Sequence, residues 1–238
     1  MQTKTETRTE LVDIDLRNRT LDSIRRDFIC AFWKIVPRAR TAGKRAMDIF
    51  VASLMLLLLA PVFLLIVVLI KLADRGPVLF WQDRVGKFGK TFRFPKFRSM
   101  VVNAEALQRQ LDAQNQHAAG VTFKMKRDPR ITWIGRIIRR ASIDELPQLW
   151  CVLKGEMSLV GPRPPLLREV ALYTISDRRR LEAVPGLTCY WQVQGRSEIP
   201  FPRQVELDVD YIENQSLSLD VKLLAQTVPA IIGGRGAY

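Results

Sequence analysis

The sequence predicts a mixed α/β protein, mostly helical, in which a membrane re-entrant helix is followed by a compact cytosolic domain. Three observations support this fold class. An apolar run of 22 residues, from position 49 to position 70, contains no charged side chain, and runs beyond about 18 residues are typical of membrane segments. The chain after it mixes short β-rich stretches with amphipathic ones. Lys and Arg number 37 against 24 Asp and Glu, a net charge of +13, which implies an anionic partner such as nucleic acid, anionic lipid or a phosphorylated ligand.

Cysteine and histidine are too few for several kinds of site. The three cysteines, Cys30, Cys151 and Cys189, lie far apart without a CxxC pair, which excludes a disulfide framework and a thiolate zinc site and fits a reducing cytosol. His117 is the only histidine, so an ordinary Ser-His-Asp triad or a multi-histidine metal site is not easily built. Any catalysis must therefore depend on carboxylates, lysines and arginines.

Residues 1–43 are the first expected segment, a polar N-terminal arm of mixed charge on the cytosolic side. A secretory signal is not expected there, because the first long apolar run begins too far from Met1.

Residues 44–72 are predicted as a re-entrant membrane helix broken at Pro61. A proline in mid-helix removes one backbone hydrogen bond and clashes with the carbonyl four residues earlier. Both flanks of the run are basic, with Lys44 and Arg45 on the first side and Lys71 and Arg75 on the second, whereas a spanning helix prefers one basic end. Each half reaches roughly 18 Å, enough to enter one leaflet and return. A spanning helix with a proline kink is the alternative.

Residues 73–238 are predicted as a cytosolic domain with both strands and helices. Strands are expected at 77–81 and 91–94, on either side of a turn at 86–90. This turn resembles a P-loop only superficially, because the first glycine of that motif is replaced by Arg84. The expected helices cover residues 102–117, 131–140, 143–153, 205–214 and 219–228, the third of them ending at Gly155.

The stretch 139–149 contains the strongest candidate site. Ser142 and Glu145 have the spacing of a capping box, although a helix that starts one or two residues later suits Pro147 better. Either start places Asp144 and Glu145 in a first helical turn, where the helix dipole favours their ionised forms and free N–H groups favour a phosphate. An ionised aspartate can act as a nucleophile, and an adjacent glutamate can hold a divalent cation. The alternative is plain capping by acidic residues.

Two other segments carry basic residues in unusual surroundings. Residues 154–165 contain two glycines and three prolines around Arg163, which predicts a stiff loop. A rigidly held arginine suits bidentate phosphate recognition, and a solvated arginine on a connector is the alternative. Residues 94–99 alternate basic and aromatic side chains, so Lys96 and Arg98 either lie in water on an edge strand or contact headgroups or ligand phosphates.

These motifs together resemble a known family, the bacterial sugar transferases of the small monotopic type, which are polyprenyl-phosphate glycosyl-1-phosphate transferases. The resemblance covers residues 44–238 in family order. Its motifs are KRAMD (44–48), AP (60–61), GPV (76–78), RVG (84–86), KFRSM (96–100), DPR (128–130), SIDELPQL (142–149), LKGEMSLVGPRP (153–164), PGLT (185–188), WQV (191–193) and GR (195–196). The final RGAY resembles exopolysaccharide members that transfer galactose phosphate or glucose phosphate.

The resemblance implies a role for each matching residue. Asp144 matches the nucleophile, and Glu145 matches the residue that holds Mg²⁺. The remaining matches are Arg139 and Arg163, which bind nucleotide or sugar phosphates; Lys96 and Arg98, a basic pair near the active site; and Pro61, which breaks the re-entrant helix. The sequence departs from the family pattern at Ala60, where serine is usual, and at Cys189, where glycine is usual.

The function implied by this resemblance is transfer of a sugar 1-phosphate from a UDP-sugar to undecaprenyl phosphate. The expected route is a covalent phosphosugar on Asp144 with release of UMP, as the first step of exopolysaccharide repeat-unit assembly. The expected place is the cytosolic face of the bacterial inner membrane, with inner-membrane lipids and no nucleic acid as partners, and the oligomeric state, homodimer included, is open. The alternatives are a membrane-tethered basic domain that binds nucleic acid or anionic lipid without catalysis, and a phosphatase using Asp144.

Overall fold

The computed structural model describes residues 41–104, 106–107, 128–195 and 198–233. The predicted N-terminal arm lies outside the described residues except for its last three positions. Most of the helix predicted over residues 102–117 also lies outside them. All contacts discussed below belong to the compact unit Arg45–Tyr238.

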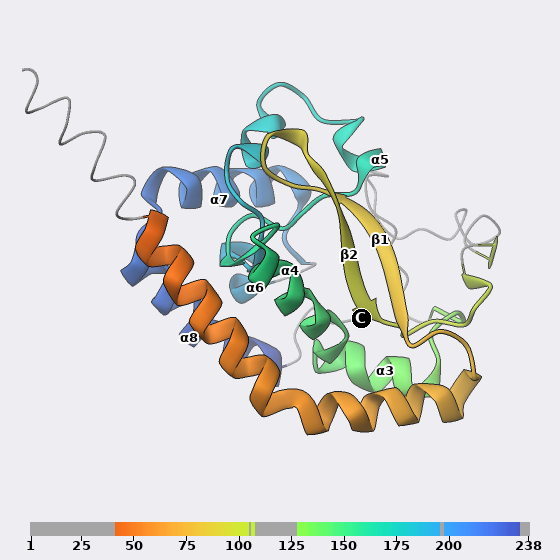
Figure 1. Cartoon of the computed structure of the whole chain (residues 1–238). Coiled ribbons are helices and arrows are strands. Elements are labelled where there is room, and N and C mark those ends of the chain that lie inside the picture. The colour runs from red at the N-terminus through yellow and green to blue at the C-terminus, as the bar shows by residue number, and fades with distance from the viewer. Residues whose placement is uncertain (1–40, 105, 108–127, 196–197, 234–238) are drawn as a thin grey trace, which may run out of the picture. The chain divides into compact units, whose positions relative to one another are not determined.

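A long helix, Thr41–Asp74, contains the apolar run. It has 34 residues and an 18-residue window of mean hydropathy 3.1, so it is long and apolar enough to cross a membrane. Large apolar side chains face outward along it, including Phe50, Leu57 and Leu64, which are 69%, 73% and 67% exposed. The helix continues through Pro61, and Figure 1 shows it, in orange, changing direction part-way along its length.

A β-hairpin follows the long helix, as predicted. Strand β1 (Leu79–Val85) pairs antiparallel with β2 (Thr91–Phe97), in a register that places Leu79 opposite Phe97. The short 3₁₀ turn η1 (Lys87–Gly89) connects the strands, which confirms the connecting turn in place of a P-loop. Strand β2 buries Phe92 and Phe94 on one face and Phe97 on the other, so only its first part alternates between exposed and buried side chains.

The segment after the hairpin differs in part from the prediction. Helix α3 (Trp133–Arg140) is confirmed and begins at Thr132, whose hydroxyl accepts a hydrogen bond from the Gly135 N–H. The helix expected over 143–153 is instead a 3₁₀ helix, η3 (Ile143–Gln148), continued by α4 (Leu149–Lys154). Pro147 explains the change, because an α-helix would need its missing N–H, whereas short 3₁₀ turns are common at helix ends.

Gly155 ends α4 as predicted, whereas Ser142 does not cap η3 with its side chain. Gly155 ends α4 with a φ of 85°, the left-handed conformation that glycine adopts without strain. Ser142 has a φ of 55°, and its side chain caps no N–H. The capping box is therefore absent, and η3 begins directly after Ser142 rather than one or two residues later. Asp144 and Glu145 lie in its first turn, as both alternatives predicted.

The rest of the chain surrounds a second small sheet. Strand β3 (Ser158–Val160) pairs in parallel with β4 (Gly186–Thr188), so the stiff loop predicted over 154–165 contains a strand. The helices, in chain order, are α5 (Leu167–Val170), η4 (Asp177–Glu182), α6 (Tyr190–Gln194), α7 (Phe201–Asn214) and α8 (Leu217–Gly233). The last two confirm the helices predicted at 205–214 and 219–228.

Two apolar clusters join these elements to the long helix. One contains Ala52 of the long helix, Phe94 of β2, Val152 of α4, Tyr211 of α7 and Leu223 of α8. The other joins the second half of the long helix to the end of β2 and to α3 through Ile66, Ile70, Phe97, Ile134 and Ile138. Strand β2 and the 3₁₀ helix η3 therefore belong to the same apolar clusters as the long helix.

Polar contacts fix the first turns of the long helix as well. Arg45 donates hydrogen bonds to the carbonyl oxygens of Val152 and Leu153 at the end of α4. The buried carboxylate of Asp48 accepts from the Leu159 N–H of β3 at 3.1 Å. Arg45 was predicted as a membrane anchor, and in the structure its guanidinium caps α4.

Candidate active site

Asp144 and Glu145 lie on η3 beside strand β2. The Glu145 carboxylate contacts Lys96 Nζ of β2 at 2.6 Å and Arg163 Nη2 at 3.0 Å, and Arg163 Nη1 lies 3.4 Å from its second oxygen. Asp144 is 8% exposed. The structure thus brings four predicted site residues together from three separate segments of the chain.

The two carboxyl groups have opposite pKa shifts. Burial raises the pKa of Asp144 to about 6; the charge of Glu145 adds to this effect, and the charge of Lys96 opposes it. Burial also disfavours ionised Glu145, but the charges of Arg163 and Lys96 outweigh it and hold the pKa of Glu145 well below its usual value. Glu145 raises the pKa of Arg163 in return. Glu145 is therefore a fixed anion, and Asp144 titrates near neutral pH.

Two further arginines act electrostatically on this pair. The charge of Arg139, in the last turn of α3, lowers the pKa of Asp144, although less than the charge of Lys96 does. The charge of Arg84 on β1 lowers the pKa of Lys96. The pKa of Arg84 is itself lowered by burial and by the charge of Arg163, and raised by the charge of Glu145. The cluster of Lys96, Arg84, Arg139 and Arg163 around the two carboxylates is called the cationic site below.

Arg84 was not predicted as a site residue, although it lies in a motif of the resembled family. It is buried, its Nη1 donates to the Pro164 carbonyl oxygen at 2.9 Å, and its guanidinium lies 5.1 Å from the centre of the Phe94 ring. A second hydrogen bond joins β1 to the same loop: the Val85 N–H donates to the Pro165 carbonyl oxygen at 3.0 Å. The only sequence signal is an arginine two residues before the turn glycine Gly86.

The residues just before Arg163 are hydrogen-bonded to β4 of the second small sheet. The Gly161 N–H donates to the Thr188 carbonyl oxygen at 3.0 Å, and the Gly186 N–H donates to the Pro162 carbonyl oxygen at 2.9 Å. The backbones approach so closely that a Cβ on Gly186 would lie 2.0 Å from the Gly161 nitrogen. Backbone bonds on both sides thus fix Arg163, and with its bond to Glu145 they make the solvated-connector alternative wrong.

The second member of the predicted basic pair has another partner. Arg98 is 7% exposed, and its Nη2 lies 3.3 Å from a carboxylate oxygen of Asp74, the last residue of the long helix. Its guanidinium occupies the space that a Cβ on Gly76 would need. Since Lys96 and Arg98 are both largely buried, the alternative that placed their charges in water is wrong.

The carboxylate chemistry of the site suits a magnesium ion only if other ligands complete the coordination. Among residues 41–104, 106–107, 128–195 and 198–233, no group of three or more His, Cys, Asp or Glu side chains could hold a metal ion. Mg²⁺ in nucleotide sites is commonly bound by one or two carboxylates, with substrate phosphates and water supplying the other ligands. Glu145, beside Asp144, is a carboxylate donor of that kind.

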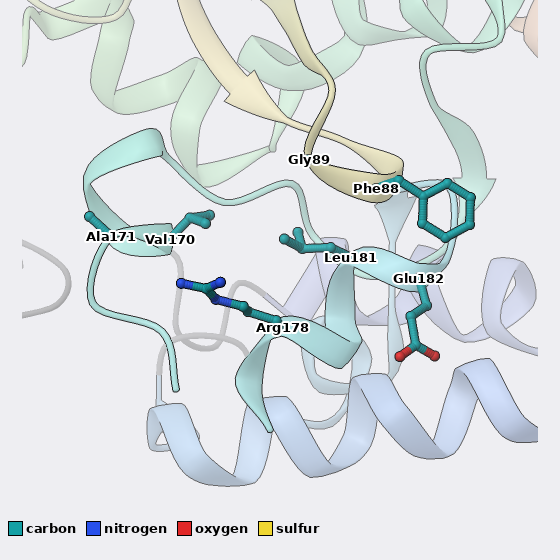
Figure 2. Close-up of a pocket in the computed structure, with 7 residues that line it drawn as sticks. All are labelled: Phe88, Gly89, Val170, Ala171, Arg178, Leu181 and Glu182. Carbon is teal, nitrogen blue, oxygen red and sulfur yellow. The ribbon is translucent and has the colours of Figure 1, made fainter. Parts of the chain in front are cut away.

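A shallow surface pocket lies elsewhere in the molecule. It has a volume of about 460 Å³ and is lined by Phe88, Gly89, Val170, Ala171, Arg178, Leu181 and Glu182. Figure 2 shows these side chains arriving from the hairpin turn, from the end of α5 and from η4. No predicted site residue lines this pocket, and the opposite end of β2 carries Lys96.

Comparison with known proteins identifies the family of this chain. The family model for bacterial sugar transferases matches residues 39–234. The chain is 47% identical to a galactosyl transferase of Streptococcus agalactiae over 196 residues, which are 82% of this chain and 43% of that protein. It is 39% identical over 201 residues to an exopolysaccharide production protein of Rhizobium meliloti, covering 82% of this chain and 88% of that protein. It is 41% identical over 198 residues to an undecaprenyl-phosphate galactose phosphotransferase of Salmonella typhimurium, covering 82% and 41%.

The fold, the site and these matches define the class of protein as a transferase enzyme. The chain belongs to the bacterial sugar transferase family. It spans less than half the length of two of these relatives and most of the length of the third.

Proposed function

We propose that this protein transfers a sugar 1-phosphate from a UDP-sugar to undecaprenyl phosphate in exopolysaccharide synthesis. The main support is the difference between the two adjacent carboxylates. Within the described residues, Lys96 and Arg163 both form ion pairs with Glu145, and neither forms one with Asp144. Relatives named as undecaprenyl-phosphate galactose and glucose phosphotransferases support the acceptor and the class of sugar.

The first step is attack by a carboxylate oxygen of Asp144 on the sugar-bearing phosphorus. A bond forms between that oxygen and phosphorus, the bridging P–O bond breaks, and its electron pair leaves with UMP. Lys96, Arg139 and Arg163 supply positive charge where negative charge develops on phosphate oxygens. In the second step an oxygen of the lipid phosphate attacks the same phosphorus, which restores the Asp144 carboxylate and yields the diphosphate-linked lipid sugar.

Glu145 is the residue that would hold Mg²⁺, which would neutralise phosphate charge and stabilise the leaving UMP. The acceptor is already an anionic nucleophile and needs little base catalysis, so the absence of histidine within the described residues is no obstacle.

The membrane helix gives the reaction its place in this proposal. A re-entrant Thr41–Asp74 helix, bent at Pro61, would keep both ends on the cytosolic face of the inner membrane. The site, packed on this helix through Phe94 and Phe97, would then lie at the level of the lipid phosphate. A basic domain without catalysis does not require a buried carboxylate pair, and the family match does not favour it.

The test is a panel of UDP-sugars with undecaprenyl phosphate and Mg²⁺, using membranes that contain the protein. The expected products are UMP and one lipid-linked sugar diphosphate, seen by mass spectrometry, and both should be absent with Asp144→Asn. Release of inorganic phosphate in place of UMP would identify a phosphatase, and loss of neither product with Asp144→Asn would contradict the assigned nucleophile.

A further inference from the structure

Glu145 is fully engaged in the substrate-free site. Lys96 contacts its Oε1 at 2.6 Å, and Arg163 forks across both of its oxygens at 3.0 and 3.4 Å. The Glu145 side chain is 17% exposed, and those of Lys96 and Arg163 are 19% and 28% exposed. Because these groups are largely removed from water, their attraction is stronger than that of surface ion pairs. A divalent cation that enters alone must therefore compete with two fixed cations for one carboxylate.

The charge count of the cationic site points in the same direction. Lys96, Arg84, Arg139 and Arg163 bring four positive charges, and Asp144 and Glu145 bring two negative charges. A bare divalent cation would increase this excess, whereas a diphosphate would offset it. Phosphate oxygens are also the acceptors that a lysine and a forked arginine bind most readily.

Lys96 and Arg163 differ in how freely they can change partner: the side chain of Lys96 is flexible, whereas the backbone of Arg163 is fixed. Lys96 Nζ lies 5.4 Å from the centre of the Phe94 ring; because lysine carries its ammonium on a flexible four-carbon stem, rotation of the stem can give this group another partner. Arg163 has its backbone fixed on both sides by hydrogen bonds at Gly161 and Pro165, so only its guanidinium can change partner.

We propose that Lys96 and Arg163 are exchangeable counter-ions of Glu145, which hold its carboxylate in the empty site and pass to the phosphates of a nucleoside diphosphate when it binds. The inference deepens the proposed function and rests on it for the ligand. It makes metal and nucleotide binding mutually dependent: Glu145 is available to a divalent cation only when an anionic diphosphate has taken its two partners. By linkage, each ligand then tightens the other by the same factor.

The test measures binding at equilibrium without lipid acceptor, so no turnover is involved. Mn²⁺ binding to the full chain in detergent is followed by electron paramagnetic resonance of the free ion, with and without UDP, and UDP binding is measured by calorimetry with and without Mn²⁺. We expect weak Mn²⁺ binding alone, a gain of about tenfold or more with UDP, and an equal gain in the reverse direction, within the usual range of coupling.

Variants separate the counter-ion exchange from general effects of charge. Lys96→Gln should tighten Mn²⁺ binding without UDP, weaken UDP binding without Mn²⁺ and reduce the coupling factor, whereas Lys96→Arg should retain the coupling. Arg163→Gln should change Mn²⁺ binding, UDP binding and the coupling factor in the same directions as Lys96→Gln, which gives an independent test. Lys90→Gln removes an exposed charge next to the hairpin turn and should match the unmodified protein.

Two results would overturn the exchange: Mn²⁺ binding of equal strength with and without UDP, or a coupling factor equal in Lys96→Gln, Arg163→Gln and Lys90→Gln. A chain that shows the coupling but transfers no sugar phosphate would contradict the proposed function only. A chain that transfers sugar phosphate without coupling would contradict the exchange only.

Discussion

Asp144 and Glu145 are neighbours in the chain, yet their surroundings give them different chemistry. Glu145 is surrounded by Lys96 and Arg163 and remains an anion at any physiological pH. Asp144 is buried beside this anion, and no residue that the structure describes places a cation equally close to it; burial raises its pKa to about 6. Two titratable groups with separated pKa values are typical of sites that divide nucleophilic and electrostatic roles.

The first prediction concerns pH. Only ionised Asp144 can attack phosphorus, and its pKa of about 6 lies above the usual range for aspartate. The value of kcat/KM for the UDP-sugar, which reports groups of the free enzyme, should therefore be level above about pH 7 and fall about tenfold per unit well below pH 6. A steady kcat/KM down to pH 5, in protein that circular dichroism finds folded, would contradict the assignment.

The second prediction concerns the metal ligand. Glu145→Gln keeps the shape of the side chain but removes its charge, so activity should fall by on the order of 100-fold or more and depend more steeply on Mg²⁺ concentration. Chelation of divalent ions should abolish the activity of the unmodified protein. Glu206→Gln, at an exposed ion pair with Arg203, is the matched control. Full activity after chelation would show that Glu145 has another role.

At the scale of elements, a clamp made of two sheets positions Arg163. Strand β1 holds Pro164 and Pro165, and strand β4 holds Gly161 and Pro162. The hairpin that carries Lys96 also carries Arg84, so one element supplies both a group that binds Glu145 and a group that fixes the loop opposite it. Positioning of this kind matters because misplacement by about 1 Å can cost about 100-fold in rate.

The third prediction tests the clamp. Arg84→Leu should leave Pro164 without its donor, cost about 1–3 kcal/mol of folding stability, and lower kcat more than it raises KM, because Arg163 would be misplaced. Arg84→Lys should recover part of kcat. Arg93→Gln, on the exposed face of β2 over Trp81, should change neither constant. Equal kinetics for Arg84→Leu and the unmodified protein would remove Arg84 from the site.

The sequence predicted the elements that have strong local signals and missed those that depend on distant contacts. The hairpin, α3 and the last two helices follow from alternation, periodicity and caps within each segment. Strand β3 was missed because three residues pair only with a strand 28 positions away, at Gly186. The local sequence suggested roles for Asp144, Glu145 and Arg163 but left plainer alternatives open, and the family resemblance chose between them. Arg84 escaped because its carbonyl partner lies 80 positions away.

At the scale of the whole molecule, the apolar helix and the site form one packed unit. The helix exposes side chains such as Phe50 and Leu57 that water would not favour, while Ala52 and Ile70 pack into the two clusters that contain the site elements. In the proposed function, this packing would let a soluble nucleotide sugar and a lipid phosphate reach one set of residues.

The fourth prediction concerns topology. If the helix is re-entrant, labels at residue 1 and at Tyr238 should be protected equally from reagents added outside intact cells. Pro61→Leu restores the missing N–H and should produce molecules whose two ends lie on opposite sides, whereas Ala60→Leu, which keeps the proline, should not. An externally labelled N-terminus in the unmodified protein would establish a spanning helix.

The measurement that tests the central claim most directly is the mass of the protein after exposure to its donor alone. With UDP-sugar and Mg²⁺ but no lipid, the intact protein should gain the mass of one sugar phosphate, mapped to Asp144, and release about one equivalent of UMP. Adding undecaprenyl phosphate should discharge the adduct, and Asp144→Asn should form none, because an amide cannot make the acyl phosphate. Release of UMP only when lipid is present, without any adduct on Asp144, would contradict the covalent mechanism.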